Sequence, residues 1–423
     1  MKVNKWTLGL AAVGLVSLPT LGLAEEKGSP VMSALSSTTI SGYVSTSMRW
    51  SPGQDAGPDG IRRFPAYSYN NANKQDGFNL DVVKLTIEKA LDEDQWAAGY
   101  KVDLLFGQDA NNLGTSSSGV NTGDFAIKQA YVALRAPVGN GLDFKVGVFD
   151  TVIGYESFDA GNNPNYTRSY GYTIEPTTHT GVLSTYQFTE WIGMAAGVAD
   201  TVGPRINQKA WNQVNPRKAE SYKTYMGSLI LTAPESFGFL KGSTLYGGVV
   251  NGFNNTGTTT AGVAGQVQAN YYVGTTIHTP ITALKLGASY DYMGVSARQY
   301  PTVSAQSGYA NATALYASYQ VTEKLSVHGR GEYATFSPNL ANVGGVLPGT
   351  ASKIVAATAT IQYDLWKNVL SRLEVRWDHQ ADGAGRAYGK TQTAAPTGGL
   401  NNNAQTGSRR NSWLIAGNII YKF

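Results

Sequence analysis

The sequence contains no cysteine, only four histidines, and 15% charged residues against about 25% in an ordinary globular domain. Without cysteine there is no disulfide framework, and four scattered histidines form no recognisable metal-binding cluster. After residue 23 no run of about 18 consecutive apolar residues occurs, so no later membrane-spanning helix is predicted. Long amphipathic helical patterns are also missing, which argues against a soluble enzyme of this length.

The amino terminus has the pattern of an export signal. Lys2 and Lys5 precede an uncharged run that ends in Gly22-Leu23-Ala24, with small residues at the two positions that a signal peptidase reads. A transmembrane helix is the alternative, but glycines and a proline interrupt the run and its apolar core is short. We therefore predict a cleaved signal peptide over residues 1–24 and a short periplasmic lead over residues 25–37.

Loss of the two signal-peptide lysines reduces the 33 basic residues to 31, against 29 acidic residues. This balance argues against an electrostatic surface for nucleic acid, and no nucleic-acid partner is expected. Glycine and tyrosine are abundant, with 49 and 25 residues. Together with small polar residues, they suit strands that face lipid on one side and water on the other.

From residue 38 onward, apolar and polar residues alternate in segments of about ten residues, the periodicity of a β-strand. In segment 96–106, the aromatic and aliphatic residues lie opposite Lys101 and Asp103. In segment 369–379, four charged residues share one face. Such a face is costly against a dry core but is expected on the wall of a water-filled lumen.

Sixteen such segments are predicted, an even number, as a bacterial single-chain barrel requires. Their ranges are 38–50, 78–91, 96–107, 125–136, 142–150, 179–188, 191–199, 222–233, 243–251, 266–278, 284–293, 310–321, 325–335, 353–363, 369–379 and 412–423. Short connections alternate with long ones, as periplasmic turns alternate with extracellular loops in outer-membrane barrels. The prediction is an all-β, transmembrane, antiparallel up-and-down β-barrel over residues 38–423, with both termini in the periplasm.

Aromatic residues lie at the ends of the predicted strands, where an amphipathic indole suits the lipid headgroup level. The predicted membrane-interface aromatics are Trp50, Trp96, Trp191, Trp366, Trp377, Trp413, Tyr421 and Phe423. The closing segment 413–423 has one apolar face and ends on Phe423, which resembles the signal recognised by the barrel-assembly machinery. Taken alone, this segment would also fit a buried edge strand in a soluble sandwich.

The third long loop, 151–178, differs from the others because it is rich in tyrosine and acidic residues. We predict that it folds into the lumen and forms a constriction, its acidic groups facing basic wall residues such as Lys101, Arg135 and Lys145. The alternative is an ordinary surface loop whose tyrosines cover one another. The predicted pore residues are Asp150, Glu156, Asp159, Arg168 and Glu175, with Lys101, Arg135, Lys145, Arg330, Arg372 and Arg376 on the wall.

Three motifs carry a family resemblance. The stretch Phe144-Lys-Val-Gly-Val-Phe-Asp-Thr-Val-Ile-Gly-Tyr-Glu156, then Asn165-Tyr-Thr-Arg-Ser-Tyr170 and His179-Thr-Gly-Val182, resembles the OmpL-like outer-membrane β-barrel porins. The motifs lie within residues 40–200, and the rest of the chain matches by strand pattern and its terminal Phe. The resemblance implies a passive or loosely selective channel in the outer membrane of Gram-negative-type bacteria, and it assigns no solute to particular positions.

We therefore predict a porin, a water-filled channel for passive diffusion of small hydrophilic solutes and ions, with no enzymatic activity, metal or cofactor. Its expected partners are outer-membrane lipid, the barrel-assembly machinery and the solutes, and the pattern is compatible with a homotrimer. One alternative is an adhesin or structural anchor that only presents its loops. The less favoured alternative is an outer-membrane enzyme, because no histidine has the Ser two residues later that a lipase-like rim site often carries.

Overall fold

The computed structural model describes most of the predicted barrel. The described residues are 37–53, 62–70, 74, 76–92, 94–116, 123–208, 222–253, 266–296, 298–299, 304–305, 307–337, 353–382, 386–390 and 408–423. The predicted signal peptide, 1–24, and nearly all of the lead segment lie outside them. Among the described residues, no helix is long and apolar enough to span a membrane.

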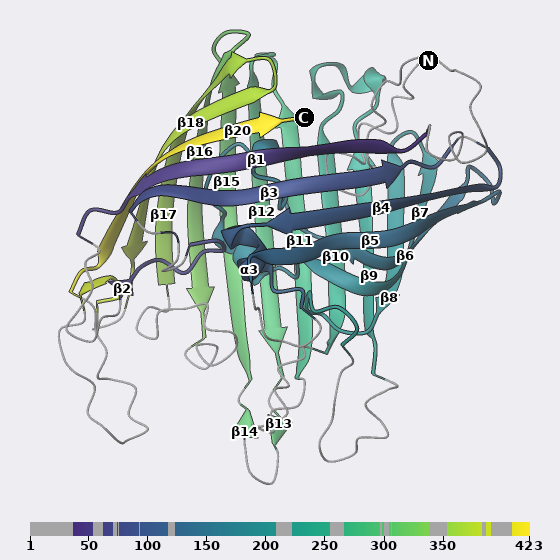
Figure 1. The fold of residues 1–423 in the computed structure, drawn as a ribbon, viewed down its shortest axis with the longest axis horizontal. Coiled ribbons are helices and arrows are strands. Elements are labelled where there is room, and N and C mark those ends of the chain that lie inside the picture. Colours follow the sequence, from purple (N-terminus) through teal and green to yellow (C-terminus); the bar gives the residue numbers. More distant parts are fainter. Residues whose placement is uncertain are drawn as a thin grey trace.

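Sixteen strands of the described chain close into one antiparallel barrel, with each strand next to its neighbour in sequence. Figure 1 shows the first strand, in purple, beside the last, in yellow. The sixteen predicted segments are therefore confirmed, with small shifts at their ends. The strands are β1 (Thr39–Trp50), β3 (Gly77–Lys89), β4 (Ala97–Phe106), β5 (Phe125–Ala136), β6 (Leu142–Asp150), β7 (Thr178–Thr189), β8 (Ile192–Ala199), β9 (Thr224–Thr232), β10 (Thr244–Phe253), β11 (Val267–His278), β12 (Leu284–Val295), β15 (Gly308–Gln320), β16 (Leu325–Phe336), β17 (Lys353–Trp366), β18 (Val369–Gln380) and β20 (Asn411–Lys422).

Short elements decorate the connections between these strands. The helices are α3 (Gln108–Leu113), η1 (Ala160–Asn162), α4 (Tyr170–Ile174) and η2 (Glu235–Leu240). Two small two-stranded sheets pair β2 (Arg62–Arg63) with β19 (Gly389–Lys390), and β13 (Arg298–Gln299) with β14 (Ser304–Ala305). The β2–β19 sheet links the first long loop to the last long loop, which lie far apart in sequence.

The barrel closes at a seam between β1 and β20, where the last residue of the chain takes part. The backbone N–H of Gly42 donates to the carbonyl of Phe423 at 2.9 Å, and the N–H of Phe423 donates back at 3.0 Å. A Cβ on Gly42 would lie 2.1 Å from the carbonyl oxygen of Lys84 and 2.8 Å from the Phe423 ring. Only glycine therefore permits this close approach.

The wall is apolar outside and polar inside, the reverse of a soluble protein. On β18, Leu373 and Val375 are exposed, whereas the neighbouring Arg372, Glu374 and Arg376 are buried. Lipid covers the outer face of a membrane barrel, so the charged residues face the enclosed lumen. This arrangement matches the alternation in the sequence.

Two β-bulges break the alternation and turn additional charges inward. The pairing of β1 with β3 shifts so that Asp81 has no partner across the strand, and Asp81 and Val82 are both buried. The pairing of β4 with β5 shifts in the same way at Lys128, and both Lys128 and Gln129 are buried. A bulge adds one residue to one strand and reverses the facing of the residues beyond it. Strict alternation from the other inward residues of these strands would place Asp81 and Lys128 on the lipid-facing side.

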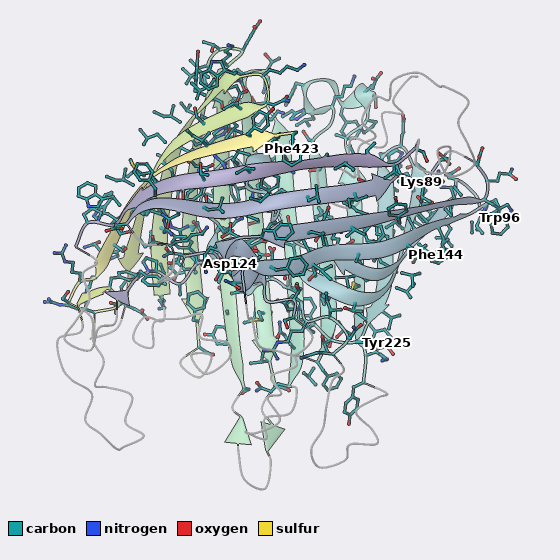
Figure 2. The ribbon with its side chains drawn as sticks, viewed as in Figure 1. Lys89, Trp96, Asp124, Phe144, Tyr225 and Phe423 are labelled. Carbon is teal, nitrogen blue, oxygen red and sulfur yellow. The ribbon has the colours of Figure 1, made fainter. Side chains whose placement is uncertain are left out.

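The predicted interface aromatics lie on the outer surface at the strand ends. Trp96 and Lys89 flank one short turn and lie together at the edge of the barrel (Figure 2). At the opposite end, Trp377 pairs across the sheet with Trp413, and their ring centroids are 6.2 Å apart. Exposed side chains in this set are Trp50, Trp96, Trp191, Trp366, Trp413, Tyr421 and Phe423, and Trp377 is half-buried.

Candidate pore constriction

The loop between β6 and β7, residues 151–177, lies against the inward face of the barrel wall. Its start is apolar: Val152 and Ile153 are buried among Leu183, Met226 and other inward side chains of β5 to β11. The hydroxyl of Tyr246 donates to the carbonyl of Val152. One side of the lumen thus holds the start of the loop by apolar packing.

The second half of the loop contains helix α4, which packs against β12, β15 and β16. The Ser169 side chain caps the helix by accepting a hydrogen bond from the backbone N–H of Tyr172 at 3.1 Å. The backbone N–H of Ser169 in turn donates to Glu156 at 2.8 Å, and that of Tyr170 donates to Glu332 of β16 at 2.7 Å. Carboxylates therefore hold the first turn of the helix in place.

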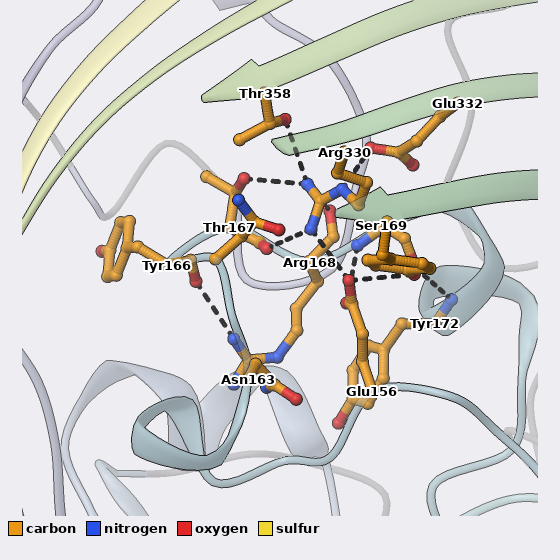
Figure 3. A network of polar contacts seen from close by, with 12 residues as sticks. Glu156, Asn163, Tyr166, Thr167, Arg168, Ser169, Tyr172, Arg330, Glu332 and Thr358 are labelled. Atoms are coloured by element: carbon orange, nitrogen blue, oxygen red, sulfur yellow. Dashed lines mark hydrogen bonds and ion pairs between the residues drawn. The ribbon is translucent and has the colours of Figure 1, made fainter. Parts of the chain in front are cut away.

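Arg330 of β16 is the centre of the contacts between loop and wall (Figure 3). Its Nε donates to Glu332 at 2.7 Å, and Nη1 donates to Glu156 at 2.8 Å. The same guanidinium donates to the carbonyl of Thr167 at 2.7 Å and to its hydroxyl at 3.0 Å. Its side chain is fully buried, so one wall arginine joins a loop carboxylate, a wall carboxylate and the loop backbone.

Strand β18 adds a second set of anchors. The carboxylate of Glu374 accepts the backbone N–H groups of Tyr166 at 2.6 Å and Thr167 at 2.9 Å. Arg376 donates to the carbonyl of Arg168 at 2.6 Å and pairs with Asp378 at 2.9 Å. These charge-assisted bonds to the main chain fix the path of the loop rather than leaving it in solvent.

Two more of the predicted arginines also bind the loop. Arg372 of β18 donates to the carbonyl of Asn163 at 3.1 Å and to the side chain of Asn418 at 2.8 Å. Arg168, within the loop, donates to the carbonyl of Tyr166 at 3.0 Å, and its guanidinium lies 5.5 Å from the ring centroid of Tyr172. Both side chains are therefore used to shape the loop.

Two of the predicted acidic residues pair with lysines. Asp150 lies 2.5 Å from the ammonium of Lys128, and Asp159 lies 2.8 Å from that of Lys84. The hydroxyl of Tyr43 also donates to Asp159 at 3.1 Å. Burial raises the pKa of Asp159, but Lys84 and Lys128 outweigh it and hold that pKa below its ordinary value. Asp159 is therefore an anion at neutral pH.

Glu175 differs from the other acidic residues because it faces another carboxyl group. Its side chain is hydrogen-bonded to Asp291 of β12. Burial and then the neighbouring Asp291 raise the pKa of Glu175 well above its ordinary value, so the pair holds a proton to higher pH than an ordinary glutamate does. Helix α4 meets this pair closely: a Cβ on Gly171 would lie 2.3 Å from a carboxylate oxygen of Asp291.

The expected wall partners Lys101, Arg135 and Lys145 have described neighbours on the wall, and Lys145 also interacts electrostatically with the predicted acid Asp150. Lys101 lies 3.3 Å from Glu88, Arg135 lies 2.6 Å from Asp143, and Lys145 lies over a tyrosine ring. Arg135 is next to the short turn 137–141, far from the long-loop end, and so lies at a different height from loop 151–177. Strand alternation gives the facing of a residue but not its depth in the lumen.

The first long loop also reaches the lumen, which was not predicted from the sequence. Tyr67 is buried, its ring packs edge-on against Tyr170 at 6.4 Å, and the guanidinium of Arg376 lies 3.7 Å from its centroid. Lys74 from the same loop lies 3.0 Å from Asp81. The sequence does carry a signal for this contact in Tyr67-Ser-Tyr69, an aromatic cluster like that of loop 151–178.

No other chemistry stands out in the described part of the chain. No group of three or more histidine or acidic side chains there is arranged to hold a metal ion. His179 contacts the hydroxyl of Thr151 at 3.1 Å, and His328 contacts the hydroxyls of Ser318 and Ser326 at 2.8 and 3.0 Å. Both imidazoles therefore have ordinary hydrogen-bond partners.

Solved outer-membrane channels share this fold. The outer membrane channel DcaP of Acinetobacter baumannii is 11% identical, with 91% of this chain and 97% of that chain covered, and a TM-score of 0.55. An anion-selective porin from Comamonas acidovorans is 12% identical, with 92% and 99% covered, and a TM-score of 0.56. OmpT of Vibrio cholerae, in a trimer form, is 14% identical, with 91% and 99% covered, and a TM-score of 0.52. At these identities the likeness is one of fold.

Comparison of the sequence itself identifies the family. No curated protein sequence matches the chain. The model of the family described as "Putative beta-barrel porin-2, OmpL-like" matches residues 37–423, which is nearly the whole chain and agrees with the motifs found around residues 144–182. The protein thus belongs to the OmpL-like β-barrel porin family and has the fold of an outer-membrane channel.

Proposed function

We propose that the protein passes small hydrophilic solutes and ions across the outer membrane by passive diffusion, through a lumen narrowed by loop 151–177. The observation that carries the proposal is the docking of this loop on the inner wall, centred on Arg330 and Glu374. A loop bound by buried charge pairs has a defined position, and a defined position is what a constriction requires.

We further infer which charges a passing ion meets. The network around Arg330 is buried and internally paired, so it is the scaffold of the constriction. Lys101, Arg135 and Lys145 remain partly exposed on the β4 to β6 wall, next to Glu88 and Asp143. These partly exposed groups then act as the charge filter below the loop, and reversal potentials in a salt gradient measure which ion they favour.

The surroundings of the channel belong to the same proposal. Both termini and the short turns lie in the periplasm, and the long loops face outward. The strand-end tryptophans contact lipid headgroups, and Phe423 presents the closing strand to the barrel-assembly machinery. The protein is exported by a cleaved signal peptide, residues 1–24, and assembles as a homotrimer like the trimer form of OmpT.

Planar-bilayer recording of the purified protein tests the proposal. The intact channel should show stable unitary conductance, and deletion of residues 158–170 should raise it by removing the constriction. An equally long deletion over 339–351, in another long loop, is the matched control and should leave conductance unchanged. Heat-modifiable migration on a gel verifies that each variant is folded. A folded barrel that passes no ions would instead support the adhesin or structural anchor, and unchanged conductance after the loop deletion would remove the constriction from the proposal.

A further inference from the structure

The last long loop, residues 381–410, carries basic residues in its described parts, 381–382, 386–390 and 408–410, at one sector of the barrel rim. The sequence of the loop contains one acidic residue, Asp382, and four basic residues, Arg386, Lys390, Arg409 and Arg410. The described side chains of Arg386, Arg409 and Arg410 are all exposed. Exposed arginines in excess over carboxylates form a surface that attracts anions.

Contacts between the first and last long loops hold this cluster together. Backbone pairing of β2 with β19 places Arg62 opposite Lys390. The carbonyl of Arg409 accepts the N–H of Tyr388 at 3.0 Å, and its guanidinium lies against Gly53, where a Cβ would be 2.1 Å from Nη1. The cluster thus has a fixed backbone rather than the freedom of an open loop.

The position of the cluster identifies its partner. Arg409 and Arg410 immediately precede β20, so Arg410 is only three residues, about 10 Å, beyond the outward-facing Trp413. Trp413 and its neighbours Trp377 and Trp50 form the aromatic belt of this wall sector. In a membrane, the first layer above such a belt is the headgroup layer, which places the arginines at the height of lipid phosphates.

Another basic side chain, that of Lys353, lies near this cluster on the lipid-facing surface. Lys353 begins β17, is exposed, and its backbone N–H donates to Asp382 at 2.8 Å. Because it belongs to the outward set of β17, it faces the lipid side and not the lumen entrance. The backbone at the end of β18 links this residue to the cluster, because the N–H of Ala381 donates to the carbonyl of Lys353 and that of Gln380 to the carbonyl of Arg410, both at 2.9 Å. A solute funnel would need all the charges over the lumen, whereas the outward-facing Lys353 suits an anion embedded in the membrane surface.

We infer that the rim formed by Lys353, Arg386, Arg409 and Arg410 is a docking site for the phosphate groups of a lipid headgroup in the outer leaflet. A guanidinium binds a phosphate through two parallel hydrogen bonds, and the lipid chains pack below against the Trp413 sector. The inference rests on the proposed outward placement of the long loops. It adds a specific lipid partner to the channel.

The double variant Arg409→Gln, Arg410→Gln tests the site. Full-length protein extracted in mild detergent is titrated with a bis-phosphorylated glycolipid and with the same glycolipid after dephosphorylation. Two basic groups near a membrane surface contribute about 1 kcal/mol each, so affinity for the phosphorylated form should fall about 30-fold. The control variant Lys324→Gln, Lys367→Gln removes the same charge from the exposed short turns and should bind as the parent does.

Three results would overturn the inference: equal lipid affinity in the double variant and the parent, equal affinity for the dephosphorylated lipid, or displacement of the lipid by millimolar inorganic phosphate. The last result would make the cluster a site for free phosphate. Unitary conductance is recorded on the same preparations. A conducting channel with unchanged lipid affinity refutes the docking site and leaves the pore function standing, whereas loss of conductance in the parent refutes the pore function alone.

Discussion

Replacement of Arg330 by glutamine should release loop 151–177 from the barrel wall. The guanidinium makes hydrogen bonds to Glu156, Glu332, Thr167, the carbonyl of Arg168 and the hydroxyl of Thr358. Glutamine retains a polar head but reaches few of these groups and carries no charge. Glu156 and Glu332 would remain buried without their shared cation.

The size of the effect is set by this burial. Breaking a buried ion pair by removing one partner costs about 3–5 kcal/mol, because the other charge is left uncompensated. The barrel keeps its backbone ladder, so most of this cost falls on the docked state of the loop. Since 1.4 kcal/mol is a factor of ten, the docked population relative to the undocked one should fall by at least about a hundredfold.

Single-channel recording and limited proteolysis measure the release together. Chymotrypsin, which cuts after aromatic residues, should cleave the variant at Tyr166, Tyr170 or Tyr172, all of which are buried in the parent. Unitary conductance should rise and become noisier. Arg330→Lys keeps the charge without the planar fork and should give an intermediate result.

Arg135→Gln is the matched control, because it removes an arginine that pairs with Asp143 away from the loop. It should leave cleavage of the loop unchanged. If the folded Arg330→Gln barrel resists chymotrypsin and conducts like the parent, the wall network does not position the loop.

Two further predictions concern a titratable contact and the barrel seam. Burial and Asp291 raise the pKa of Glu175 in the folded state, so the protonated side chain stabilises the docked loop. This stabilisation is complete below the ordinary glutamate pKa, and it is lost as the pH rises through the pKa of the folded state. Chymotrypsin cleavage and conductance should therefore increase with pH in the parent but not in Glu175→Gln; the same pH dependence in both would contradict this. Gly42→Val should destabilise the seam with Phe423 by about 1–3 kcal/mol and lower the temperature at which the folded gel band is lost. Gly417→Ala, with open space at its Cβ, is the control, and equal behaviour of the two variants would refute the steric argument.

The strands were predictable from sequence because one physical demand governs all of them. Lipid lies outside the barrel and water or charge lies inside it, so apolar and polar residues must alternate with a period of two over about ten residues. The backbone N–H and C=O groups of each strand must also all be hydrogen-bonded to neighbouring strands. This demand gives the sixteen strands and the inward facing of Arg330, Arg372 and Arg376 on β16 and β18. No comparable demand acts on the loops, whose placement depends on particular side chains.

The features of the candidate site that the sequence did not reveal also have physical causes. Asp81 and Lys128 are turned inward by β-bulges, which one inserted residue creates without any compositional signal. Arg135 has the predicted facing but lies next to the short turn 137–141, far from the long-loop end. Depth in the lumen depends on the register between neighbouring strands, and a single strand pattern does not contain the register.

The loop is held in two chemically different ways, and this difference decides how it can move. Its first residues, Val152 and Ile153, are anchored in an apolar cluster, whereas the stretch from Glu156 onward is held by charges centred on Arg330. Apolar packing does not titrate, whereas paired charges are screened by salt and the Glu175–Asp291 pair responds to pH. A change of pH should therefore release the α4 end while the Val152 end stays in place. The constriction would then open by an outward swing of the charge-held stretch about the anchored Val152 end, which would expose its tyrosines to chymotrypsin.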